Sequence, residues 1–145
     1  MVNSMKKILK FIIVFIIGIF LGYYVSYTNS IKDIFTSYYK AFQVGVYTNL
    51  DAAITYSSKY EDAIIIEDNE LYRVYVAILK DQDNIENMSK YLNTHGIDYY
   101  LKDISINNKD VKKEIQGYES LMDNESEVVF LEINKMIMET YKESL

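Results

Sequence analysis

Two strand-like segments, each followed by an amphipathic helical pattern, constrain the fold of this chain most. The segments run from Ala41 to Tyr47 and from Leu71 to Leu79, and in both of them apolar residues alternate with polar or aromatic ones. A two-residue period is typical of a strand with one buried face, and the longer period that follows is typical of a surface helix. The order of elements predicts a βαββαβ unit.

Residues suited to helix ends mark the two expected helices. Asn49 precedes the first helix, and Asp81 or Asp83 precedes the second, where their side chains can accept hydrogen bonds from the first turn. Gly96 follows the second helix, as a C′ glycine does. The other two strands are expected at 63–66 and 98–104. The sequence therefore predicts an α+β domain with one four-stranded antiparallel sheet and helices on one face, similar to ferredoxin- or RNP-like folds.

The helix-free face of this sheet is the candidate binding surface. Strand alternation predicts that Phe42, Val44 and Val46 of the first strand point inward, as do Tyr72, Val74, Val76 and Ile78 of the other. The residues left for the open face are suited to a sugar ligand, because aromatic rings offer flat apolar area and amides bond hydroxyls. The candidate ligand-binding residues are Gln43, Gly45, Tyr47, Arg73, Tyr75 and Lys102.

Arg73 has two interpretations. Its guanidinium can bind a carboxylate through two parallel hydrogen bonds, which fits an acidic polysaccharide. The alternative is an ordinary solvated sheet face on which Arg73 pairs with a neighbouring acid of the same chain.

The N-terminal region predicts a membrane anchor. Residues 11–28 carry no charge, and with Ile8 and Leu9 the apolar run is long enough to cross a bilayer as a helix over 8–28. Lys6, Lys7 and Lys10 cluster at its start, so the positive-inside rule places residues 1–7 in the cytoplasm and the C-terminal part outside. A cleaved signal peptide is the rival interpretation, but the run is long and lacks a small-residue cleavage site. Residues 29–40 form a short connector.

Charge and composition exclude several classes of function. Residues 41–145 hold ten Lys or Arg and twenty acids, and this acidic balance argues against nucleic acid as a partner. The chain has no Cys, which excludes disulfides and thiolate metal sites. Its one histidine, His95, stands at an expected helix end, and no nucleophile, phosphate-loop or metal-binding motif occurs. The sequence therefore predicts a non-enzymatic protein without metal or cofactor.

Residues 107–145 carry two further helical stripes of apolar residues. The stripes consist of Val111, Ile115, Tyr118 and Met122, and of Val129, Ile133, Met136, Ile137 and Tyr141. So much apolar surface favours a folded C-terminal helical extension over a disordered one. One interpretation is that the helices pack on the domain or on each other. The other is that the second stripe, with Met136 and Met138, docks a protein partner or a second copy.

The central region resembles a known family. The segment Phe42 to Ala53 resembles the opening strand, polar turn and alanine-bearing helix of SPOR domains, and the segment Tyr72 to Val76 resembles their Y-R-V-x-V strand. The segment Tyr91 to Lys102 resembles their last helix, glycine and strand. The match covers residues 39–106. It implies binding to peptidoglycan glycan strands denuded of stem peptides, and enrichment at septa of cell division or sporulation.

The chain departs from the family pattern at two places. Ala77 and Ile78 stand where the family usually has glycine, often followed by proline, and Val46 stands where a small polar residue is common.

Together, the apolar segment and the resemblance favour a single-pass protein of the bacterial cell membrane whose SPOR-like domain, residues 41–106, binds the cell wall outside the membrane. The alternative is a non-enzymatic membrane interaction protein whose degenerate domain and helical tail dock a protein partner.

Overall fold

The computed structural model describes residues 18–19 and 38–145, and the chain divides into two units, Met1–Thr36 and Ser37–Leu145. In the first unit only Gly18 and Ile19, both helical, are described. The expected membrane span at 8–28 therefore falls almost wholly outside the described residues, as do the cytoplasmic end at 1–7 and most of the connector. Among the helices that are described, none combines the length and apolar composition needed to cross a membrane.

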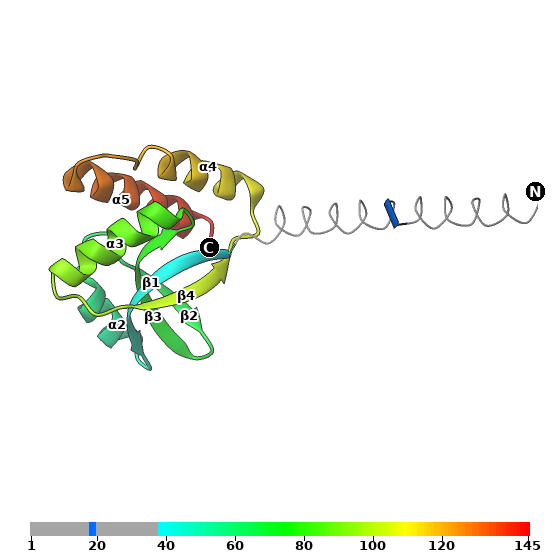
Figure 1. The fold of residues 1–145 in the computed structure, drawn as a ribbon. Helices are drawn as coiled ribbons and strands as arrows, with labels where there is room; N and C mark the ends of the chain where they lie inside the picture. The colour runs from blue at the N-terminus through cyan, green and yellow to red at the C-terminus, as the bar shows by residue number, and fades with distance from the viewer. Residues whose placement is uncertain (1–17, 20–37) are drawn as a thin grey trace, which may run out of the picture. The chain divides into compact units, whose positions relative to one another are not determined.

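The second unit is built on one antiparallel sheet of four strands. The strands are β1 (Tyr38–Tyr47), β2 (Ile64–Asp68), β3 (Leu71–Leu79) and β4 (Tyr100–Ser105), in the spatial order β2-β3-β1-β4 (Figure 1). Helix α2 (Leu50–Ser57) connects β1 to β2, and α3 (Gln82–Thr94) connects β3 to β4. The predicted βαββαβ order and antiparallel four-stranded sheet are confirmed.

The expected capping residues begin and end these helices. The Asn49 side chain accepts hydrogen bonds from the first turn of α2, and Asp81, rather than Asp83, does the same for α3. Gly96 follows α3 with a φ of +64°, a left-handed conformation that glycine adopts without strain. Between β2 and β3, Asn69 and Glu70 both have positive φ, as a two-residue hairpin turn of type I′ requires.

The pairing of β1 with β3 is irregular at its centre. Its register runs Phe42↔Ala77, Gln43↔Tyr75 and Gly45↔Val74, so that it passes over Val76 on β3 and Val44 on β1. An extra residue in one strand reverses which side chains face which side from that point on. Gln43 and Tyr75 consequently share a side, whereas the next pair, Gly45 and Val74, points to the other side.

Both faces of β3 are covered along most of its length. Every residue from Val74 to Leu79 is buried, although successive side chains of a strand point to opposite faces. On one face Val76 lies with Met88 and Leu92 of α3. On the other, the second helix of the C-terminal tail (Glu127–Glu143) supplies cover near Tyr75. The expectation of a fully open face is therefore wrong for this part of the sheet.

The tail forms helices α4 (Lys109–Glu119) and α5 (Glu127–Glu143), which pack side by side (Figure 1). Met138 of α5 lies beside Ile64 of β2, and Tyr141 lies near Tyr75, which adds to the rise that burial causes in the pKa of Tyr141. The inner sides of both helices join the same hydrophobic core as the sheet through Ile115, Phe130, Ile133, Ile137 and Met138. The interpretation that the tail packs on the domain is the one the structure supports.

Polar contacts fix the tail as well. Oε1 of Glu119, at the end of α4, accepts hydrogen bonds from the main-chain N–H groups of Lys80 and Asp81 at 2.7 and 2.9 Å. The buried Asn84 side chain of α3 donates to the Glu119 carbonyl at 3.0 Å. These bonds connect the end of α4 to the junction between β3 and α3. They therefore join the tail to the domain.

Candidate ligand-binding surface

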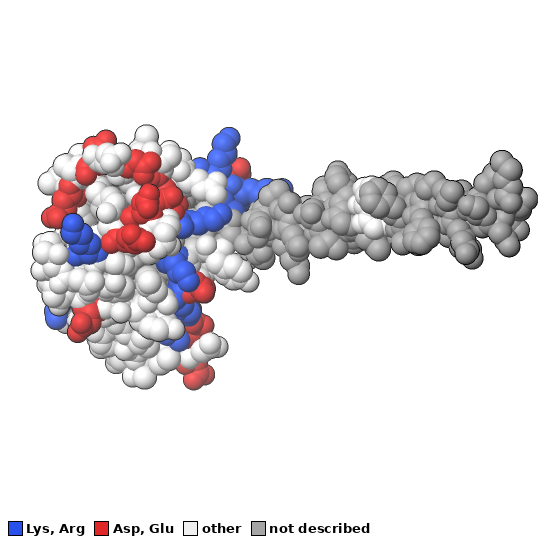
Figure 2. Space-filling model, in the orientation of Figure 1, with Lys and Arg blue, Asp and Glu red and all other residues white. Residues whose placement is uncertain are grey.

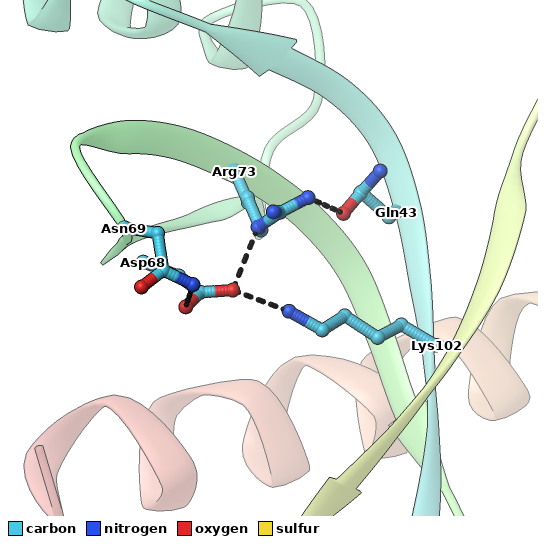
Figure 3. A network of polar contacts seen from close by, with 5 residues as sticks. All are labelled: Gln43, Asp68, Asn69, Arg73 and Lys102. Carbon is cyan, nitrogen blue, oxygen red and sulfur yellow. Dashed lines mark hydrogen bonds and ion pairs between the residues drawn. The ribbon is translucent and has the colours of Figure 1, made fainter.

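Four strands contribute side chains to one polar network, shown in Figure 3. Oδ2 of Asp68, the last residue of β2, accepts from Nε of Arg73 on β3 at 2.9 Å and from Nζ of Lys102 on β4 at 2.5 Å. Nη1 of Arg73 donates to Oε1 of Gln43 on β1 at 3.2 Å. Asn69, in the hairpin turn, donates to the second Asp68 oxygen at 3.0 Å. The network, which we call the Arg73 network, comprises Gln43, Asp68, Asn69, Arg73 and Lys102.

Strand register explains why these residues meet. Gln43 lies opposite Tyr75 on β3 and opposite Tyr100 on β4. Arg73 is two residues from Tyr75, and Lys102 is two residues from Tyr100, so both side chains point to the side of the sheet on which Gln43 lies. The irregularity at Val76 of β3 is essential here, because regular pairing would have placed Gln43 opposite Val76 instead of Tyr75.

The charges of the network do not cancel, since two cations face one carboxylate. The hydrogen bond from Lys102, followed by the contact with Arg73, lowers the pKa of Asp68 and keeps it ionised. Burial raises the pKa of Tyr75, although Lys102 and Arg73 nearby oppose that shift. The Arg73 and Lys102 side chains are partly exposed, so that a ligand in solution can reach them.

Of the six predicted site residues, three join the Arg73 network, Tyr75 lies next to Lys102 of that network, and two lie on the opposite side of the sheet. Gln43, Arg73 and Lys102 join the Arg73 network. Tyr75 lies beneath it and is only 2% exposed, so the expectation that its ring offers an open surface is wrong. The tail contributes to this burial, because Tyr141 of α5 lies near Tyr75.

Gly45 and Tyr47 lie on the opposite side of the sheet from the network. The ring of Tyr47 packs against Tyr56 of α2, with 5.4 Å between ring centroids. A Cβ atom at Gly45 would be 2.7 Å from the Tyr47 ring, so this glycine makes room for that packing. The prediction that both residues share a face with Gln43 is wrong, because the register shifts between Gln43 and Gly45.

Two exposed residues beside the network were not among the predicted site residues. Tyr100, 65% exposed, lies opposite Gln43, and Val46, 41% exposed, lies opposite Arg73. Val46 was expected to point inward, and this is wrong for the same reason of register. The adjacent tyrosines 99 and 100 gave no sequence signal for which one is outside. In the structure Tyr99 packs on Phe42 and Tyr100 is the exposed one.

His95 and the acidic side chains are the other polar groups to consider among residues 38–145. Nδ1 of His95 lies 2.8 Å from the Tyr91 carbonyl, and its ring packs on the Tyr91 ring. In the described part of the chain, no three His, Cys, Asp or Glu side chains are grouped so as to hold a metal ion.

Figure 2 shows acidic side chains gathered over the side where α3 and α5 lie, with basic ones in a band nearer β4. The Arg73 network thus places excess positive charge on an acidic domain.

Comparison with known proteins gave one structural likeness. No protein-family model matches the chain, and no curated protein matches it. Among solved structures, the chain is similar to the peptidoglycan binding domain of the B. subtilis cell wall lytic enzyme CwlC, with 22% sequence identity and a TM-score of 0.42. The likeness covers 48% of this chain and 92% of that domain. At this level of likeness, function has to be inferred from the residues themselves.

Proposed function

We propose that residues 38–145 bind the glycan strands of peptidoglycan, in stretches from which the stem peptides have been removed. The observation that carries this proposal is the Arg73 network, in which Gln43, Arg73 and Lys102 from three strands meet beside the exposed ring of Tyr100. The proposal agrees with the resemblance of residues 39–106 to SPOR domains.

Each part of this surface matches a part of such a glycan. A sugar ring can stack on the flat apolar face of Tyr100, and the Gln43 amide can bond hydroxyl or acetamido groups. A strand without stem peptides carries lactyl carboxylates, which Arg73 and Lys102 can bind with charge-assisted hydrogen bonds. On an acidic domain, the local excess of positive charge favours such an anion at this place over the rest of the surface.

The departures from the SPOR pattern leave this surface largely intact. Ala77 and Ile78 are fully buried, so they fill the core rather than contact a ligand. Val46 is exposed on the side of Arg73, where its apolar surface can lie against a sugar ring. We therefore expect that binding is retained.

We further propose that the apolar segment at 8–28 anchors the protein in a bacterial cell membrane, with the N-terminus in the cytoplasm. The lysine cluster before the segment supports this orientation. The domain would then act outside the membrane, as a non-enzymatic module in cell division or sporulation. External protease should degrade the domain in intact cells stripped of their wall, and full protection would overturn both the orientation and the wall-binding role.

The decisive experiment is sedimentation of residues 37–145 with purified cell walls, before and after an amidase removes the stem peptides. These residues share one hydrophobic core, so they should fold without the N-terminal segment. Binding should rise after amidase treatment. A control is Lys40→Ala, which removes a lysine paired with Asp103 outside the Arg73 network and should bind like wild type. Equal absence of binding before and after treatment would reject the proposal.

A second candidate function is docking of a protein partner through α5. Val128 and Met136 are 71% and 45% exposed on this helix, whose other apolar residues are mostly in the core. If wall binding fails, and a protein that co-purifies with wild type is lost with Val128→Ser and Met136→Ser, this function replaces the first.

A further inference from the structure

The Asp68 carboxylate is fully engaged by the network that is proposed to receive a ligand carboxylate. One of its oxygens accepts from Nε of Arg73 and from Nζ of Lys102, and the other accepts from Asn69. Arg73 and Lys102 thus already hold one carboxylate, and that carboxylate comes from the same chain (Figure 3).

The donors of Arg73 are divided between two internal acceptors. A guanidinium offers five N–H groups in a rigid fork, and a carboxylate is bound best by two neighbouring N–H groups along one edge. Nε belongs to one such edge and donates to Asp68, while Nη1 belongs to the other and donates to Gln43. Because Nε carries a single N–H group, a ligand carboxylate can bind along the edge that includes Nε only by displacing Asp68.

Asp68 is held in place by a short hairpin rather than by burial. It pairs with Leu71 across the two-residue turn of Asn69 and Glu70, so the carboxylate stays beside Arg73 in the free protein. Yet both ion pairs are partly exposed, and ion pairs in contact with water are held weakly. The Asp68 carboxylate is therefore well placed to occupy the anion site of Arg73 and Lys102. Its ion pairs are also weak enough for a ligand carboxylate to replace it.

We propose that Asp68 is an internal competitor, which occupies the carboxylate site of Arg73 and Lys102 in the free protein and is displaced when a glycan carboxylate binds. This inference rests on the proposed function. It identifies the ligand group recognised at this point as a carboxylate, and Asp68 as the residue that sets how tightly it is held. Release of Asp68 should couple ligand binding to movement of the β2–β3 hairpin tip.

The matched pair Asp68→Asn and Asp103→Asn tests the inference. Both remove one negative charge, but Asp103 pairs with Lys40 and its neighbour in β4 is Lys102, so it points to the other side of the strand. If Asp68 competes, Asp68→Asn should tighten carboxylate binding about two- to fivefold, as expected for the loss of an exposed ion pair. Asp103→Asn should leave it unchanged, whereas an effect of net charge alone would appear in both variants.

The probe is N-acetylmuramic acid, which carries the lactyl carboxylate, with N-acetylglucosamine as the sugar that lacks it. Arg73 is the only arginine of the chain, so the NMR signal of its Nε–H group is unique. Titration of residues 37–145 with N-acetylmuramic acid should shift this signal at lower concentration in Asp68→Asn than in wild type. N-acetylglucosamine should give the two proteins the same response.

Wall sedimentation separates the two possible failures. If wild type binds amidase-treated walls while Asp68→Asn gains no affinity for walls or for N-acetylmuramic acid, the competitor role is overturned and the proposed function stands. If Asp68→Asn binds more weakly than wild type, Asp68 positions Arg73 instead, which also overturns it. If no protein responds to either ligand, the competitor role and the proposed function are both rejected.

Discussion

The side chain of Asn134 on α5 donates a hydrogen bond of 2.9 Å to the main-chain carbonyl of Val76 on β3. Val76 is the residue that the register between β1 and β3 passes over. A tail helix therefore provides a polar partner at the point where the sheet is irregular. The same irregularity turns Gln43 toward Arg73, so the fold of the tail and the shape of the candidate surface depend on one feature.

Replacing Asn134 tests this dependence. Asn134→Leu keeps a side chain of similar size but removes the donor to the buried Val76 carbonyl, which should lower the free energy of unfolding by about 1–3 kcal/mol. Urea denaturation measures the change. Asn87→Leu, at an exposed position of α3, should stay within about 0.5 kcal/mol of wild type, and an equal loss in both variants would contradict the role of the hydrogen bond.

Glu119 provides a prediction on pH dependence. Burial raises its pKa in the folded protein, although the Lys80 and Asp81 N–H groups oppose that shift. Because the folded state then binds a proton more readily than the unfolded state, stability should fall as pH rises from the unfolded pKa of about 4.3 through the folded pKa. Glu119→Gln keeps an acceptor for both N–H groups and should flatten this part of the pH profile in thermal unfolding.

Glu119→Ala separates the hydrogen bonds from the charge. It leaves the Lys80 and Asp81 N–H groups without their acceptor and opens space in the core, so it should be less stable than Glu119→Gln at every pH, by roughly 1–3 kcal/mol at neutral pH. A Glu119→Ala protein as stable as Glu119→Gln would show that these two bonds contribute little.

The ligand surface predicts a pattern of binding losses. Arg73→Ala should weaken sedimentation with amidase-treated walls about tenfold or more, because hydrogen bonds to charged groups contribute about 1.5–3 kcal/mol. Tyr100→Ala should weaken it with less than about 0.5 kcal/mol lost in stability, since the ring is exposed. Tyr47→Ala should leave binding unchanged while lowering the melting temperature, because its ring packs on α2. Binding lost with Tyr47 but not with Tyr100 would place the ligand on the other face.

Truncation tests the structural role of the tail. A chain ending at Ile106 loses the side chains of Ile115, Ile133 and Ile137 from the core, and exposes the apolar surface of β3 that they help to cover. It should aggregate or lose cooperative unfolding, as followed by circular dichroism and light scattering. The point variant Ile137→Ala should unfold cooperatively with about 2–5 kcal/mol less stability. A truncated domain that keeps its melting temperature would show that the tail does not contribute to the stability of the domain.

Local signals in the sequence predicted the elements well. The alternation from Leu71 to Leu79 predicted β3 with its observed ends, and Asn49 and Gly96 marked helix boundaries because their side-chain and backbone properties act within a few residues. The same local signals indicated two tail helices. The meeting of Arg73 with Gln43 and Lys102 was also expected, but Gln43 faces the side of Arg73 only because the pairing of β1 with β3 passes over Val76, which the sequence did not indicate.

The faces of the strands could not be predicted in the same way. Whether Tyr47 and Gln43 share a side depends on the register shift between β1 and β3, which arises only when the two strands pair. Tyr75 is buried in the folded chain, where α5, distant in sequence, packs on β3 and brings Tyr141 near it. Alternation within one strand indicates neither the register between strands nor the packing of the tail. The prediction from sequence therefore made the open face too large and did not include Tyr100.

The position of α5 also has a consequence for how the protein behaves when it is crowded. Strand β2 begins at Ile64, opposite Tyr75, so the stretch of β3 from Val76 to Leu79 extends past it. A bare backbone edge invites strand addition by another molecule, a common start of aggregation. Asn134 of α5 takes the Val76 carbonyl on this stretch, so this acceptor is not available to a strand of another molecule. This part of the β3 edge is therefore less open to strand addition than a bare edge would be.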